Sequence, residues 1–172
     1  GAGNLLGVQQ HGHMEAVGYD LYCKMLNEAV QEQKGVKAAV DFTTLIDLDV
    51  DAFIPPAYIM NEMQKLDIYK RIAGIENVRE RDDMKDELLD RFGEIPKSVD
   101  NLLRIALVRV AAHRLYMTEV RGKNERIAFT FRPDADLNPA KVPDLLRKYG
   151  PTLAFTGYGK PFFTLKYKKT GL

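Results

Sequence analysis

The sequence predicts an α+β fold, with an N-terminal helical arm, a three-helix block and a small C-terminal β-sheet that has one intervening helix. Two observations lead to this prediction. Apolar residues recur at three- and four-residue steps through residues 59–116, whereas short β-rich runs separated by turns follow Val120. Helices and strands are therefore largely segregated along the chain. We expect residues 1–43 to form an arm and linker, and residues 44–172 to form a domain.

The arm contains an amphipathic helix, predicted at about residues 14–33 from the spacing of Val17, Leu21 and Met25. Gly35 follows it as a stop signal. The next segment, TTLIDLDVDAFIPP at 43–56, alternates apolar residues with aspartates and ends in two prolines. This pattern predicts a half-buried strand.

Three helices are predicted after the proline pair. The first starts near Ile59 and stops at Gly74. The second begins at Asn77, where Glu80 three residues on completes a capping signature, and it stops at Gly93. The third runs from about 97 to 116. Short turns join the three, so we expect them to pack as a bundle.

The C-terminal part is predicted to form a strand, a helix and a pair of strands. The strand runs are ERIAFTFRP at 125–133, PTLAFTG at 151–157 and KPFFTLKYKK at 160–169. For the helix between the first two, the signals are Asn138 as N-cap, Pro139 at the first helical position and Gly150 as the stop.

Composition and charge narrow the function classes. The chain has 45% apolar and 28% charged residues, and a net charge of +1 gives no global attraction to nucleic acid. One cysteine excludes an internal disulfide framework. The absence of an apolar run near 18 residues predicts a cytoplasmic chain with no membrane partner.

Charge is unevenly distributed along the chain. Residues 76–94 carry eight acids and four bases, whereas residues 133–172 carry seven bases and three acids. The two segments could meet each other or a partner. They could equally be the solvated faces that helices routinely carry.

The residue types that perform catalysis or bind metals do not form a convincing site. His11, His13 and Cys23 supply too few ligands in recognised spacings for zinc. His113 lies on an apolar helix face, which favours a packed, hydrogen-bonded histidine over a catalytic base. The glycines at the start lack the preceding strand and the Lys-Ser/Thr pair of a phosphate loop. We therefore predict no catalytic residue, no metal site and no cofactor within this chain.

A nucleic-acid-binding module is an alternative interpretation of the C-terminal strands, which mix aromatic and basic residues. The candidates are Tyr158, Phe162, Phe163, Tyr167, Lys160, Lys166, Lys168 and Lys169. An ordinary strand with a core face and a solvated face would show the same alternation.

Several blocks of the sequence resemble one family. GAGNLLGVQQHGH at 1–13 is similar to the C-terminal half of the TRG translocation motif, which RecG also has. The later blocks are VGYDLYCKMLNEAV at 17–30, FIPPAYI at 53–59, KLDIYKRIAG at 65–74 and MKDELLDRFGEIP at 84–96. They resemble the bacterial transcription-repair coupling factors and their C-terminal TRCF domain, and the last three have no counterpart in RecG.

The resemblance implies that this chain is the C-terminal part of a larger ATP-dependent DNA translocase. Such a parent protein uses ATP and Mg²⁺ in an upstream motor, binds double-stranded DNA, displaces stalled RNA polymerase and recruits the excision-repair protein UvrA. Within the TRG motif, Gly3, Gly7 and Gln10 would couple nucleotide state to DNA movement. A neighbouring arginine of the motif would precede Gly1.

The resemblance also implies a regulatory role for residues 44–172. In the family this module folds back on the N-terminal UvrB-like module and hides the UvrA-binding surface. Because residues 76–94 are acidic, Glu80, Asp83 and Asp86 are the candidates for that interdomain interface.

Overall fold

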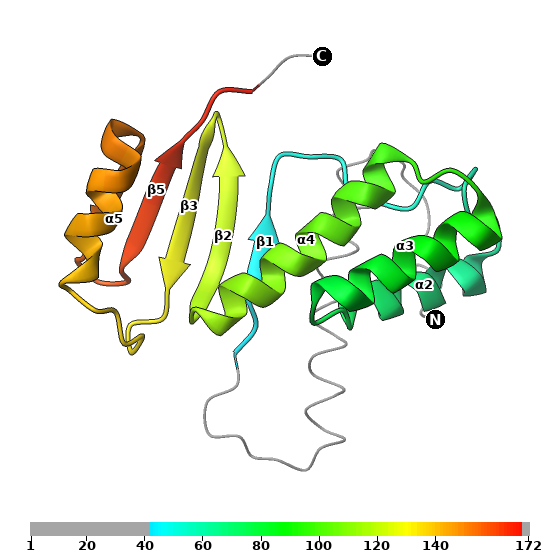
Figure 1. Ribbon diagram of the computed structural model, residues 1–172, viewed down its shortest axis with the longest axis horizontal. Coiled ribbons are helices and arrows are strands. Elements are labelled where there is room, and N and C mark those ends of the chain that lie inside the picture. Colours follow the sequence, from blue (N-terminus) through cyan, green and yellow to red (C-terminus); the bar gives the residue numbers. More distant parts are fainter. Residues whose placement is uncertain (1–41, 170–172) are drawn as a thin grey trace, which may run out of the picture. The chain divides into compact units, whose positions relative to one another are not determined.

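The computed structural model describes residues 42–169, which form two compact units (Figure 1). Residues 50–110 make up the first unit, and residues 42–49 together with 111–169 make up the second. The elements are β1 (Leu45–Asp47), α2 (Glu62–Ala73), α3 (Val78–Phe92), α4 (Lys97–Arg114), β2 (Met117–Lys123), β3 (Arg126–Phe131), α5 (Lys141–Tyr149), β4 (Leu153–Thr156) and β5 (Phe162–Lys166). The predicted α+β fold is confirmed, whereas the helix predicted at 14–33 lies outside the described residues.

The first unit is built by α2, α3 and most of α4. Asparagines start two of these helices, because the side chain of Asn61 accepts a hydrogen bond from the Gln64 N–H and that of Asn77 from the Glu80 N–H. Gly74 and Gly93 end them, as predicted. The third helix ends at Arg114, two residues before the predicted end, because Tyr116 has a left-handed backbone with φ of 59°.

The core of the first unit lies between the three helices and the segment that precedes them. Its fully enclosed side chains include Ile54, Ile68, Leu88 and Leu102, each with 0% exposure. Burial of such side chains contributes roughly 1.5–3 kcal/mol apiece. The predicted packing of the three helices is thus confirmed by one contiguous apolar cluster.

The second unit contains a five-stranded sheet in the order β1-β2-β3-β5-β4. β1 pairs with β2 in parallel, and the other neighbours are antiparallel. A two-residue turn joins β2 to β3, and its residues Asn124 and Glu125 have φ of 54° and 58°. Positive φ at both positions is the geometry of a tight type I′ hairpin.

Three details of the second unit differ from the sequence prediction. The strand expected at 43–56 is limited to Leu45–Asp47, because Ala52 and Ile54 enter the core of the first unit instead. Strand β2 was not predicted at all. Helix α5 begins at Lys141 rather than at 139, because the Asn138 side chain accepts from the Ala140 N–H in a turn that precedes the helix.

The two faces of this sheet have opposite character. Val120, Phe129, Phe163 and Phe155 lie directly opposite one another on successive strands and form an apolar row. Because side chains alternate between faces, the residues between them point to the other face, which is polar. Phe163 is 7% exposed and its ring lies 4.8 Å from that of Phe155.

Helix α5 lies over the apolar face of the sheet. It is strongly amphipathic, yet none of its residues is buried, and Leu145 and Tyr149 remain 38% and 46% exposed. Its apolar side and the sheet enclose a groove of about 630 Å³, lined chiefly by apolar side chains that include Leu145, Phe129 and Phe163. The helix is therefore held by fewer apolar contacts than α3 or α4.

Candidate functional site

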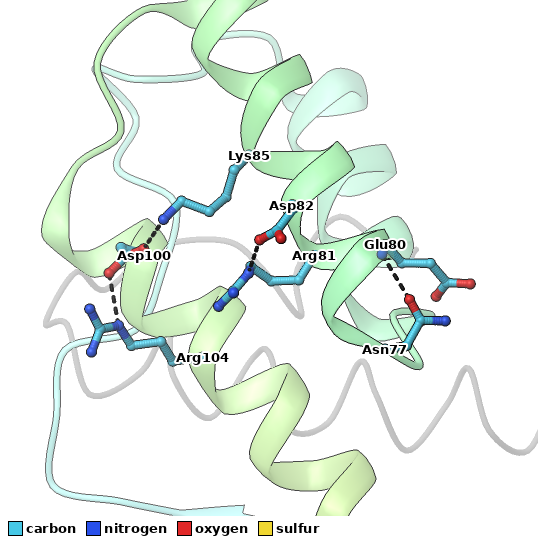
Figure 2. Close-up of polar contacts among 7 residues, drawn as sticks. All are labelled: Asn77, Glu80, Arg81, Asp82, Lys85, Asp100 and Arg104. Atoms are coloured by element: carbon cyan, nitrogen blue, oxygen red, sulfur yellow. Dashed lines mark hydrogen bonds and ion pairs between the residues drawn. The ribbon is translucent and has the colours of Figure 1, made fainter.

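Helix α3 carries the acidic segment that the sequence singles out. Its first turn is held at Asn77, whose side chain accepts a 2.9 Å hydrogen bond from the Glu80 N–H (Figure 2). The Glu80 carboxylate in turn accepts from the Glu76 N–H at 2.7 Å. Both bonds satisfy backbone donors that have no partner within the helix, so Glu80 acts mainly in starting the helix.

The far end of α3 is held by Tyr58. Its hydroxyl lies 3.2 Å from the carbonyl oxygen of Leu88 and 3.0 Å from that of Gly93, and can donate to either. Burial raises the pKa of Tyr58, which keeps this donor protonated at physiological pH. Helix α3 is therefore fixed at both ends within the first unit.

The solvent side of α3 presents three aspartates in a line, which we call the acidic stripe: Asp83, Asp86 and Asp90. Their spacing of three and four residues places them on one helix face. The buried residues Met84 and Leu88 lie on the opposite face. All three aspartates are exposed, and no ion pair or hydrogen bond joins their carboxylates to another residue in the described range 42–169.

The remaining acids of α3 are engaged within the unit. Glu87 accepts from both terminal nitrogens of Arg71 on α2, at 2.5 and 2.6 Å, and from Arg91 at 2.9 Å. The hydrogen bonds from Arg71, with a further one from Arg91, lower the pKa of Glu87 to about 2. Asp82 pairs with Arg81 at 2.6 Å (Figure 2).

A second ion-pair group joins α3 to α4. Asp100 on α4 receives Lys85 of α3 at 3.1 Å and Arg104 of its own helix at 2.9 Å (Figure 2). Partial burial works against the charged form of Asp100, but the hydrogen bonds from Lys85 and Arg104 outweigh it and lower its pKa. These pairs orient α3, so the acidic stripe faces away from the unit that carries it.

The candidate residues thus divide into two groups. Asp83 and Asp86 lie together on the open face, whereas Glu80 is committed to the helix start. Asp90 extends the stripe and was missed as a candidate, although its spacing of four residues from Asp86 could have indicated it. Gly3, Gly7 and Gln10 lie outside the described residues, so their coupling role stays a prediction.

The structure also bears on metal binding and on the environment of His113. Within residues 42–169, no three His, Cys, Asp or Glu side chains come together as a possible metal site. His113 stacks on Phe42 at 4.4 Å, and its Nδ1 lies 3.2 Å from the Thr44 hydroxyl, which itself donates to the Met117 carbonyl. Since a hydroxyl donates one proton, His113 Nδ1 is the donor in that contact.

Within residues 42–169, no helix is both long and apolar enough to span a bilayer.

Comparison with known proteins assigns the family. The family model described as the TRCF domain matches residues 48–142, more than half of the chain. The chain belongs to the TRCF domain family. A transcription-repair-coupling factor from Bacillus subtilis (strain 168) is 38% identical over 163 residues, which cover 93% of this chain and 14% of that protein. The protein of the same name from Staphylococcus aureus (strain USA300) is 43% identical over 129 residues, covering 74% of this chain and 11% of its own length.

A solved TRCF structure supports the fold as well as the family. A crystal structure described as the C-terminal domain of transcription-repair coupling factor has 27% sequence identity and a TM-score of 0.58, and the match covers 73% of this chain and 80% of that one. The chain thus corresponds to a TRCF domain that spans a small fraction of the full-length relatives. The acidic stripe lies inside the matched family region.

Proposed function

We propose that this chain is the autoinhibitory C-terminal domain of a transcription-repair coupling factor, and that it docks on the N-terminal UvrB-like module of its parent protein. In this proposal the docked domain masks the surface that binds UvrA. RNA polymerase, double-stranded DNA, ATP and Mg²⁺ are bound by other parts of the parent. The proposal places no catalytic step within residues 42–169.

The acidic stripe is the observation that carries the proposal. Three exposed carboxylates in a line, none of them in an ion pair with another described residue, produce a local negative potential that favours a basic partner surface. Leu89, which is 55% exposed, adds an apolar side chain beside the stripe. An interface of this kind can be released, because solvent-exposed ion pairs contribute only about 0.2–1 kcal/mol each.

The strength of such a lock can be bounded. An intramolecular contact worth roughly 2–4 kcal/mol leaves only about 0.1–3% of molecules open. Engagement of polymerase or DNA by the open form would then shift the population. A much stronger contact would not respond to partners, and a much weaker one would not mask anything.

The direct test is a triple variant of the parent protein, Asp83→Asn/Asp86→Asn/Asp90→Asn. We expect its UvrA affinity to rise about fivefold, because loss of three screened charge contacts removes about 1 kcal/mol from the lock. The matched control is Asp51→Asn/Asp67→Asn/Asp136→Asn, which removes the same charge from exposed positions elsewhere. An unchanged affinity in the stripe variant, or an equal rise in the control, would contradict the docking role of α3.

A further inference from the structure

The polar face of the sheet carries an arrangement of cations that the docking proposal does not use. Lys123 on β2 lies directly opposite Arg126 on β3, and Arg126 lies directly opposite Lys166 on β5. We call these three residues the cation row. All three are exposed, and none has an ion pair with another described residue.

Such a row is unfavourable without an anion. Like charges directly opposite on neighbouring strands destabilise a sheet. The acids close to the row are already engaged. Glu119 and Asp47 lie 2.6 and 3.6 Å from Arg121, and the Glu125 carboxylate accepts from the backbone N–H of Lys169. The row is therefore free to neutralise an anion from outside the chain.

Beside the cation row, the face carries small side chains on β3, β5 and β4, and it ends in aromatic side chains. The next row across the strands consists of Arg121, Ala128, Thr164 and Ala154. Arg121 is paired with Glu119, and the other three side chains are small. Phe162 lies four residues before Lys166 on β5, roughly 13 Å along the strand. Tyr158, in the hairpin just beyond Phe162, is 94% exposed.

The structure also resolves which of the sequence candidates belong together. Phe163 lies on the buried apolar face, so it cannot stack on an external base. Phe162 and Lys166 share the polar face, and Lys123 and Arg126, which are distant in sequence, join Lys166 there. Lys169 is paired with Asp49 at 2.8 Å.

From this arrangement we propose that the polar sheet face binds single-stranded DNA, with phosphates on the cation row and bases toward Phe162 and Tyr158. Proteins that hold single strands combine cations for the backbone with aromatic rings on which bases stack. A duplex hides the faces of its bases, and the acidic side chains of a peptide have no planar ring to stack.

This inference goes beyond the docking function and rests on different residues. It is tested with the full chain and a fluorescein-labelled dT12 strand by fluorescence anisotropy at 50 and 200 mM salt. Three phosphate contacts predict a slope of log affinity against log salt of about −2, so that affinity falls about 20-fold between the two concentrations.

Two variants separate charge from stacking. In Lys123→Gln/Arg126→Gln/Lys166→Gln we expect at least a tenfold loss of dT12 affinity at 50 mM salt and a slope near zero. In Tyr158→Ala we expect roughly a fivefold loss of dT12 affinity with the slope unchanged, since one base loses the ring on which it stacks and no phosphate contact is lost. The control Lys70→Gln/Lys97→Gln/Lys148→Gln lowers the net charge equally at exposed sites and should bind as the original chain does.

Four results would overturn the proposal. They are no dT12 binding at 100 µM protein and 50 mM salt, an equal loss in the control variant, displacement of dT12 by an equal concentration of a twelve-residue poly-glutamate peptide, and tighter binding of rU12 than of dT12. Thermal melting of each variant verifies that its fold is intact. Since none of these residues lies on α3, failure here would leave the docking proposal untouched.

Discussion

Glu87 is the acidic residue of α3 whose environment the structure defines best. It joins α2 to α3 through a bidentate ion pair with Arg71. Arg91, one turn along the helix, donates a further hydrogen bond to it. The pair with Arg91 was predictable from sequence, because glutamate and arginine four residues apart meet on a helix face. The contact with Arg71 was not predictable, since it spans 16 residues and depends on how two helices pack.

The pKa of Glu87 leads to a prediction about acid stability. Its folded-state pKa of about 2 lies below the ordinary 4.5, so the group stabilises the fold above pH 4.5 and loses that contribution as the pH falls toward 2. We expect Glu87→Gln to lower the free energy of unfolding by about 1 kcal/mol at pH 7, the upper range for a partly exposed pair. The deficit relative to the unmodified chain should shrink between pH 4.5 and 2.

Urea unfolding at a series of pH values measures that difference. Asp86→Asn is the control, because Asp86 lies on the open side of the same helix and its loss should change stability by less than about 0.5 kcal/mol at pH 7. A deficit for Glu87→Gln that stayed constant from pH 7 to pH 3 would show that the ion pairs are not its origin.

Among the elements, α5 is the one that the structure holds most weakly. Its residues lie over the apolar groove without being buried, whereas α3 buries Met84 and Leu88. Local opening needs less free energy where fewer apolar contacts are lost. We therefore expect the backbone amides of α5 to exchange with deuterium at least tenfold faster than those in the middle of α3, measured by mass spectrometry at pH 7. Equal protection of the two helices would contradict this account of the groove.

An element could be predicted from the sequence when nearby residues encode its ends, and could not when it depends on pairing with distant segments. The ends of α2 and α3 are encoded locally by asparagine caps and by the glycines at 74 and 93, and they were predicted within a few residues. Strand β2 has only Val120 fully buried among its large apolar residues and turns through Asn124 and Glu125 without a glycine, so its sequence resembles a polar loop. It forms a strand because it pairs with β1 on one side and with β3 on the other.

The candidate sites were predictable to the same extent: patterns within one element were visible in the sequence, and contacts between elements were not. The acidic character of α3 is visible in the sequence, and so is its helical spacing. The division between engaged Glu87 and open Asp83 requires the neighbouring helix α2. The cation row was missed because its three members come from strands that meet only in the sheet.

On the scale of the whole molecule, the two proposed surfaces lie on different compact units and have opposite charge. The acidic stripe belongs to residues 50–110, and the cation row to the unit that includes residues 111–169. A net charge of +1 conceals this separation. In the two proposals, one unit engages a basic protein surface and the other engages an anionic strand.

The central claim is that residues 44–172 restrain the parent protein, and UvrA binding to the full-length parent and to a parent lacking these residues tests it most directly. A lock of roughly 2–4 kcal/mol predicts that the truncated protein binds UvrA about 30- to 1,000-fold more tightly and has a higher basal ATPase rate. The difference in UvrA affinity between the two proteins should be smaller at 1 M than at 0.1 M salt, because salt screens the charged part of the lock. Equal UvrA affinities for full-length and truncated protein at both salt concentrations would contradict the account.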